Sequence, residues 1–124
     1  MGYSILIVDD SATTRAMVKR TIRMAGLPVL EIQDASNGKA ALEMLQSAPV
    51  NLILADLNMP EMDGFEMIRR LRASDTLKRI PIVVLSASPS AEAFARLEHV
   101  NGFLAKPFTP EAVRDVITKA LEAA

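Results

Sequence analysis

Five short runs of largely apolar, β-branched residues recur along the chain, and within them apolar residues follow one another instead of alternating with polar ones. Continuous apolarity is typical of strands that are buried on both faces of a parallel sheet. The intervening segments, roughly 16 to 26 residues long, leave room for the helical crossover that parallel neighbours require. We therefore expect strands at residues 4–8, 29–33, 51–55, 82–85 and 102–105.

The segments that follow these runs show the spacing of amphipathic helices. Thr109, Pro110 and Glu111 combine an N-cap, a proline at the first helical position and an acidic first turn. The apolar stripe of this last helix comprises Val113, Val116, Ile117, Ala120 and Leu121. Residues 12–25 form a second such helix that stops at Gly26, with an expected apolar face of Met17, Val18, Thr21, Ile22 and Ala25.

Three further helices complete a repeated strand and helix pattern. Their expected extents are residues 37–45, with Ser36 or Asn37 as the N-cap, residues 64–71 and residues 88–97. Repeated βαβ units with right-handed crossovers predict a single doubly wound α/β domain over residues 1–124. We adopt the strand order 2-1-3-4-5, one of the two common orders of such sheets, without having worked it out from these residues.

Composition narrows the chemistry that this domain can perform. The 124 residues include no cysteine, which excludes disulfides and thiol nucleophiles, and a single histidine, His99, which excludes a histidine-cluster metal site. A formal net charge of −1 offers no basic footprint for nucleic acid or an anionic membrane. Apolar runs are too short for a signal peptide or a membrane span, so we expect a cytoplasmic protein with protein or small-ligand partners.

Polar residues of complementary chemistry stand at the ends of four expected strands. Asp9 and Asp10 follow the first strand, Asp56 the third, Ser86 the fourth and Lys106 the fifth. The carboxyl ends of parallel strands share one edge of the sheet, so we expect these side chains to meet there. At roughly 4 Å and an effective dielectric near 20, each carboxylate pair repels by about 4 kcal/mol, and one lysine cannot offset three carboxylates.

A divalent cation would make this arrangement stable. Carboxylates, a backbone carbonyl and water, without histidine or cysteine, suit Mg²⁺ or Mn²⁺, and such a site points to phosphoryl chemistry with Asp56 as the nucleophile. Taken singly, each residue has a structural alternative: a helix cap for Asp9 or Asp10, a turn residue for Asp56, and a surface turn for Lys106 and Pro107. The joint occurrence at one edge favours the functional interpretation.

Several motifs together resemble the receiver domain of two-component response regulators. They are Asp9-Asp10, the segment 56–64 with the sequence DLNMPEMDG, Ser86-Ala87 and Lys106-Pro107-Phe108. The resemblance covers essentially the whole chain, with the motifs in the family's order. It implies a flavodoxin-like (βα)5 fold and, because no output domain follows, a stand-alone monomeric receiver of the CheY-like chemotaxis type.

The resemblance also implies a role for each residue that matches a family position. Asp56 corresponds to the phosphoacceptor, which takes a phosphoryl group from the phosphohistidine of a histidine kinase or a histidine-phosphotransfer domain. Asp10, Asp56 and the backbone carbonyl of Asn58 correspond to direct Mg²⁺ ligands, and Asp9 to a ligand that acts through water. The domain would thus be a regulatory phosphoacceptor and not a metabolic enzyme.

The remaining matches concern the response to phosphorylation. Lys106 corresponds to a lysine that pairs first with the phosphoacceptor and then with the phosphoryl oxygens, and the bond before Pro107 to a peptide that is usually cis. Ser86 and Ala87 correspond to phosphate-binding positions, and Phe103 to an aromatic that turns inward when the serine hydroxyl moves. A downstream protein would read the changed face of the fourth helix, fifth strand and fifth helix.

The basic residues of the first expected helix have two interpretations. Arg15, Lys19, Arg20 and Arg23 form a flank that is most simply a solvated face. The same helix resembles the family's docking surface for histidine-phosphotransfer domains.

Three other functions deserve comparison with this interpretation. A phosphatase of the haloacid-dehalogenase type also uses an aspartyl nucleophile and Mg²⁺, but it would need a second aspartate at the position of Asn58. A flavodoxin-like redox module would need a Ser/Thr/Gly-rich phosphate loop after the first strand, which this chain lacks. A pseudo-receiver scaffold that is never phosphorylated would have no need of the complete set of site residues.

Overall fold

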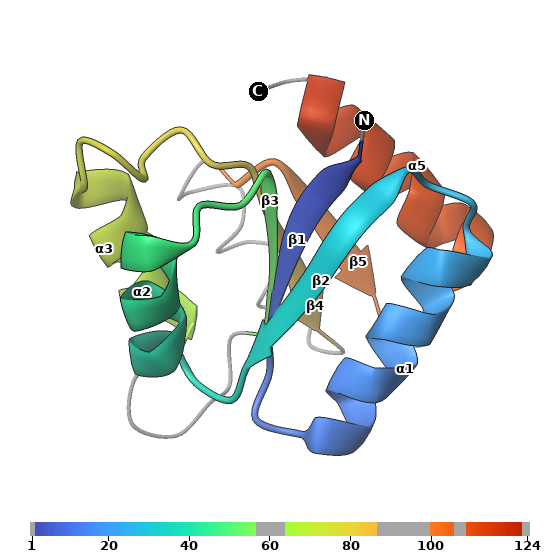
Figure 1. The fold of residues 1–124 in the computed structure, drawn as a ribbon, viewed down its shortest axis with the longest axis horizontal. Coiled ribbons are helices and arrows are strands. Elements are labelled where there is room, and N and C mark those ends of the chain that lie inside the picture. Colours follow the sequence, from blue (N-terminus) through green and yellow to red (C-terminus); the bar gives the residue numbers. More distant parts are fainter. Residues whose placement is uncertain (1, 57–63, 87–99, 106–108, 123–124) are drawn as a thin grey trace.

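The computed structural model describes residues 2–56, 64–86, 100–105 and 109–122, and within these ranges it shows a five-stranded parallel sheet in the order β2-β1-β3-β4-β5 (Figure 1). The strands are β1 (Tyr3–Val8), β2 (Val29–Ala35), β3 (Leu52–Asp56), β4 (Ile82–Ser86) and β5 (Gly102–Ala105). The helices are α1 (Ala12–Met24), α2 (Gly38–Ser47), α3 (Gly64–Ala73) and α5 (Pro110–Glu122). The doubly wound fold and the strand order are confirmed. The helix expected at residues 88–97 lies outside the described residues.

Continuous apolarity in the strands is explained by helices on both faces of the sheet. Figure 1 shows α2 and α3 on one side of the sheet and α1 and α5 on the other. Along β1, Leu6 and Val8 belong to the core beneath α2 and α3, whereas Ile5 and Ile7 belong to the core beneath α1 and α5. Since successive side chains of a strand point to opposite faces, the interior positions of a central strand must be apolar.

Two strands extend one residue beyond their expected ends, and this places functional candidates within the sheet. Asp56 is the last residue of β3, with its Cα opposite Leu85, and Ser86 is the last residue of β4, opposite Ala105. The sequence predicted both residues just after their strands. The ladder continues because its hydrogen bonds join backbone groups, which a polar side chain does not interrupt.

Helix α1 packs on the sheet through a narrower stripe than the sequence predicted. Val18 and Ile22 are fully buried and Ala25 nearly so, at the spacing of one helical face. Met17, which was expected in the core, is 53% exposed, so that prediction is wrong. One residue is a rotation of about 100° around a helix, which carries Met17 off the face that Val18 occupies.

Side chains cap three of the helices: α2 and α5 at residues that the sequence predicted, and α1 at Ser11, where the sequence had suggested Asp9 or Asp10 as the alternative cap. Ser11 Oγ accepts a hydrogen bond from Thr14 N at 3.2 Å at the start of α1, and Thr109 Oγ1 accepts one from Ala112 N at 3.1 Å at the start of α5. For α2, Asn37 Oδ1 accepts from Ala40 N at 2.8 Å, so Asn37 and not Ser36 is the N-cap. None of the described helices is long and apolar enough to cross a bilayer.

Candidate metal centre at the carboxyl edge of the sheet

Three carboxylates from two neighbouring strands meet at the carboxyl edge of the sheet. Asp9 and Asp10 follow β1, and Asp56 ends β3, which pairs directly with β1 through Val8 and Ala55. One carboxylate oxygen from each aspartate lies within 4.8 Å of the other two. Asp9 and Asp56 are buried, at 1% and 8% exposed, and Asp10 is exposed to solvent. The structure thus brings together the three aspartates that the sequence singled out.

The geometry of this cluster fits a small divalent cation. Mg²⁺ binds oxygen ligands at about 2.0–2.1 Å, so two oxygens on opposite sides of one ion lie roughly 4.2 Å apart. The three oxygens, which lie within 4.8 Å of one another, are therefore close to the separation that ligands of one ion require. The donor set consists of oxygen atoms, which is the type that Mg²⁺ and Mn²⁺ prefer. Asp9, Asp10 and Asp56 could therefore hold such an ion, with the exposed side of Asp10 open to solvent.

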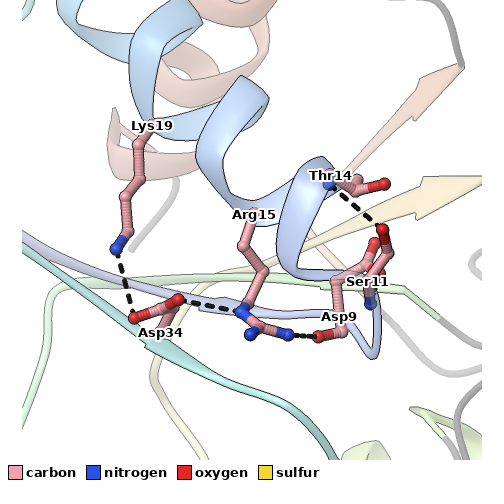
Figure 2. A network of polar contacts seen from close by, with 6 residues as sticks. All are labelled: Asp9, Ser11, Thr14, Arg15, Lys19 and Asp34. Carbon is pink, nitrogen blue, oxygen red and sulfur yellow. Dashed lines mark hydrogen bonds and ion pairs between the residues drawn. The ribbon is translucent and has the colours of Figure 1, made fainter.

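Hydrogen bonds fix Asp9 on three sides. Its backbone N–H donates to the carbonyl of Ala35 at 3.1 Å, and its Oδ1 accepts from the backbone N–H of Ser11 at 2.8 Å. Its carbonyl oxygen accepts a hydrogen bond from Arg15 Nη1 at 2.6 Å, which Figure 2 shows from close by. The loop that carries the aspartate pair is therefore tied to both β2 and α1.

Asp34, near the end of β2, holds the arginine that reaches this loop (Figure 2). Its Oδ2 lies 2.8 Å from Arg15 Nε, and its Oδ1 lies 3.1 Å from Lys19 Nζ. Partial burial by itself would raise the pKa of Asp34, but the hydrogen bonds and charges of Arg15 and Lys19 outweigh it and hold the pKa below its usual value. Asp34 is therefore ionised at neutral pH.

Sequence reasoning missed the structural role of Arg15. The arginine was interpreted as part of a solvated basic flank, yet only 16% of its side chain is exposed. The missed signal is topological, because β2 lies beside β1 and so brings Asp34 near the start of α1. Arg15, in the first turns of α1, is then within reach of both Asp34 and the carbonyl of Asp9.

Two other candidate residues lie within the described part of the chain. Ser86 ends β4 beside β3, so its backbone lies at the same edge as Asp56. Phe103 on β5 is half-buried, opposite Val84, and packs against the core beneath α2 and α3. The remaining candidates, Asn58, Ala87, Lys106 and Pro107, lie outside the described residues.

Comparisons of this chain with known proteins agree on one family. The family model described as response regulator receiver domain matches residues 5–118. The chain is 35% identical to chemotaxis protein CheY-3 of Vibrio cholerae over 98% of this chain and 93% of the relative, and 35% identical to chemotaxis protein CheY of Pseudomonas aeruginosa over 95% of each. Among solved structures, CheY4 of Vibrio cholerae is similar with a TM-score of 0.84 and 34% identity, covering 98% of this chain and 100% of that one.

The chain therefore belongs to the response regulator receiver domains, and the two relatives named above, which it matches over more than nine tenths of their length, are CheY proteins. Members of this family are regulatory domains and not metabolic enzymes, and they bind Mg²⁺. The resemblance that the sequence motifs indicated is confirmed.

Proposed function

We propose that this domain is a phosphorylation switch in which the carboxylate of Asp56 accepts a phosphoryl group in a Mg²⁺-dependent reaction. The observation that carries the proposal is the placement of Asp56, buried at the end of a central strand, against the carboxylates of Asp9 and Asp10. The donor would be a phosphohistidine of a histidine kinase or a histidine-phosphotransfer domain. The output would be altered binding of a downstream protein, in chemotaxis or in another phosphorelay.

The chemistry needs one oxygen of Asp56 to attack phosphorus in line with the bond that breaks. The Asp56 oxygen forms the new bond as the bond between phosphorus and the donor's histidine nitrogen breaks, which yields an acyl phosphate. Mg²⁺ supplies positive charge that offsets repulsion between the carboxylates and the incoming phosphoryl oxygens. Asp10 and the carbonyl of Asn58 would complete its direct protein ligands, with Asp9 acting through water, and the burial of Asp56 limits the approach of water to the reacting carboxylate.

Residues at the ends of the neighbouring strands β4 and β5 would couple phosphorylation of Asp56 to a change of the protein surface. Ser86 and Lys106 would bind the phosphoryl oxygens, with Ala87 beside them, so that new charge-assisted hydrogen bonds favour one of two packings. Phe103 is half-buried against the core beneath α2 and α3, and it would turn further inward when the Ser86 hydroxyl moves. The face of β5 and α5 would then carry the signal.

The exposed face of α1 offers chemistry suited to a kinase-side partner. Met17 is 53% exposed and lies beside Arg20 in a shallow hollow next to the start of α1. Met24 is 66% exposed and lies near Arg23. Apolar side chains flanked by arginines suit an amphipathic, acidic helix surface, and the start of α1 is adjacent to the loop of Asp9 and Asp10.

The direct test is incubation with Mg²⁺ and acetyl phosphate, followed at once by measurement of the intact mass. We expect a gain of one phosphoryl group that requires Mg²⁺ and disappears in Asp56→Asn. Asp75→Asn is the matched control, because Asp75 is a fully exposed aspartate in the segment after α3, and this variant should gain mass like the wild type. Absence of any gain, or a gain that persists in Asp56→Asn, would refute the proposal.

A further inference from the structure

The carbonyl of Asp9 belongs to the peptide unit that also contains the backbone nitrogen of Asp10. Because this unit is planar, the direction of the carbonyl oxygen sets the rotation of the whole unit between the two aspartates. Arg15 Nη1 donates to that oxygen at 2.6 Å, and the nitrogen that follows Asp10, on Ser11, is held by Asp9 Oδ1 at 2.8 Å. The backbone on both sides of the exposed Asp10 is therefore fixed by these two contacts.

Arg15 is itself held in place from β2. Its Nε donates to Asp34 Oδ2 at 2.8 Å while its Nη1 reaches Asp9, and Lys19 Nζ lies 3.1 Å from the other oxygen of Asp34 (Figure 2). A guanidinium can make both contacts because its donors form a rigid planar fork, whereas an ammonium group offers a single point of charge. With 16% of its side chain exposed, Arg15 is also shielded from bulk water, which strengthens these contacts.

We infer that Arg15 is a positioning residue for the proposed Mg²⁺ site, and that it orients the Asp9–Asp10 peptide so that the Asp10 carboxylate faces Asp56. The inference rests on the proposed function, because it concerns the same ion. Arg15 would act through the carbonyl of Asp9 and would contact neither the ion nor the phosphoryl group. Asp34 acts one step further away, since it orients the guanidinium, and Lys19 contacts Asp34 without reaching the loop.

Charge and positioning have opposite effects on Mg²⁺ binding, which makes the inference testable. Removing a positive charge near three carboxylates should by Coulomb's law strengthen the binding of a dication. Loss of the orienting contact should weaken it. Arg15→Met removes both the charge and the contact. Arg15→Lys keeps the charge but loses the planar guanidinium that donates to Asp34 and Asp9 at once. Lys19→Met is the matched control, because it removes a cation bound to the same Asp34 without touching Asp9.

The experiment is calorimetric titration of the unphosphorylated protein with Mg²⁺. We expect Arg15→Lys and Arg15→Met to weaken Mg²⁺ binding by about 10- to 100-fold, the range for groups that orient metal ligands. Lys19→Met should bind Mg²⁺ as the wild type does or slightly more tightly. At saturating Mg²⁺, Arg15→Lys should regain the wild-type rate of phosphorylation by acetyl phosphate, because the residue takes no part in the chemistry.

Binding of Mg²⁺ to both Arg15 variants at wild-type affinity or tighter would overturn the inference while leaving the proposed function intact. A wild type that neither binds Mg²⁺ nor gains mass from acetyl phosphate would overturn both. If Arg15→Met fails to fold, Arg15→Lys and Asp34→Asn decide the matter. Asp34→Asn should weaken Mg²⁺ binding by a smaller factor than Arg15→Lys, because the amide still offers an acceptor to Arg15.

Discussion

Asp34 illustrates how a single carboxylate outside the acidic cluster contributes to the site. Two basic side chains of α1, Arg15 and Lys19, form ion pairs with it, and Arg15 also donates a hydrogen bond to the carbonyl of Asp9. The ionised form of Asp34 is stabilised by both contacts, so its pKa lies below the usual value. The stability of the loop is thereby linked to the protonation of a residue on a different strand.

This link predicts a pH dependence with a definite sign. Because the pKa of Asp34 is lower in the folded protein than in the unfolded chain, its contribution is complete above the ordinary aspartate pKa of about 3.9 and is lost as pH falls through the folded value. Asp34→Asn should therefore lower the free energy of unfolding at neutral pH, by no more than about 1 kcal/mol, because the Asp34 side chain is 34% exposed to solvent. Urea unfolding of the wild type and of Asp34→Asn at a series of pH values measures the loss of stability and its dependence on pH.

The difference between wild type and Asp34→Asn should shrink as the pH falls below about 4. A difference that stays constant from neutral to acidic pH would contradict the assignment. Asp75→Asn controls for the loss of one surface carboxylate, because Asp75 is fully exposed and lies 3.7 Å from Lys78 on the surface.

At the scale of the elements, the end of α1 sets the path of the chain into β2. Ala25 N donates to the carbonyls of Thr21 and Ile22, and Gly26 follows with a φ of 75°. This left-handed conformation ends the helix and turns the chain towards Val29, the first residue of β2. The turn thus influences where Asp34 meets α1, eight residues further along.

Replacement of Gly26 by alanine should destabilise the fold by about 1 kcal/mol, because a side chain disfavours positive φ. An added Cβ would meet no atom within 4 Å, so the cost arises from the backbone conformation and not from a clash. Gly26→Asn should lose less, since asparagine tolerates the left-handed region better. Thermal unfolding of the two variants compares them, and an equal loss in both would contradict this explanation.

At the scale of the whole molecule, the sheet separates two cores that share no side chains among the residues that the structure describes. Ile68 on α3 lies in the core on one face, and Ile22 on α1 and Ile117 on α5 lie together in the core on the other face. All three side chains are essentially inaccessible to solvent. The strands contribute alternate side chains to the two cores, so each strand's backbone lies between them.

This layering predicts which core mutations are energetically independent. Ile68→Val and Ile117→Val should each cost about 0.5–1.5 kcal/mol, and their double variant should cost the sum within about 0.5 kcal/mol. Ile22→Val combined with Ile117→Val should deviate more from additivity, because those side chains share one core. Denaturant unfolding of the two double-variant cycles checks this, and equal coupling in both would show that the sheet does not separate the cores.

Local pattern was sufficient for most of the elements and for the acidic edge. Apolar runs without alternation predicted the strands, because burial on both faces leaves no interior position for a polar side chain. Cap residues such as Thr109 predicted helix starts, since an unpaired N–H must find a nearby acceptor. Asp9, Asp10 and Asp56 could be singled out because each stands where such a run ends.

Local pattern could not determine which residues of a helix face the sheet or which distant groups meet. Met17 has the spacing of a core residue but lies outside the stripe of Val18 and Ile22, because the packing of α1 on the sheet sets the rotation of the helix. The strand order also does not follow from local pattern, since the order depends on contacts between segments far apart in the chain.

The amino-acid sequence alone determined that the chain forms a doubly wound sheet with carboxylates at one edge, because strand burial and strand ends are recorded in short stretches of residues. Only the tertiary structure decided that β2 lies beside β1, so that Asp34 can direct Arg15 to the carbonyl of Asp9. The physical reason is that the direction of a side chain depends on packing across the whole domain, whereas periodicity reports only on its immediate neighbours.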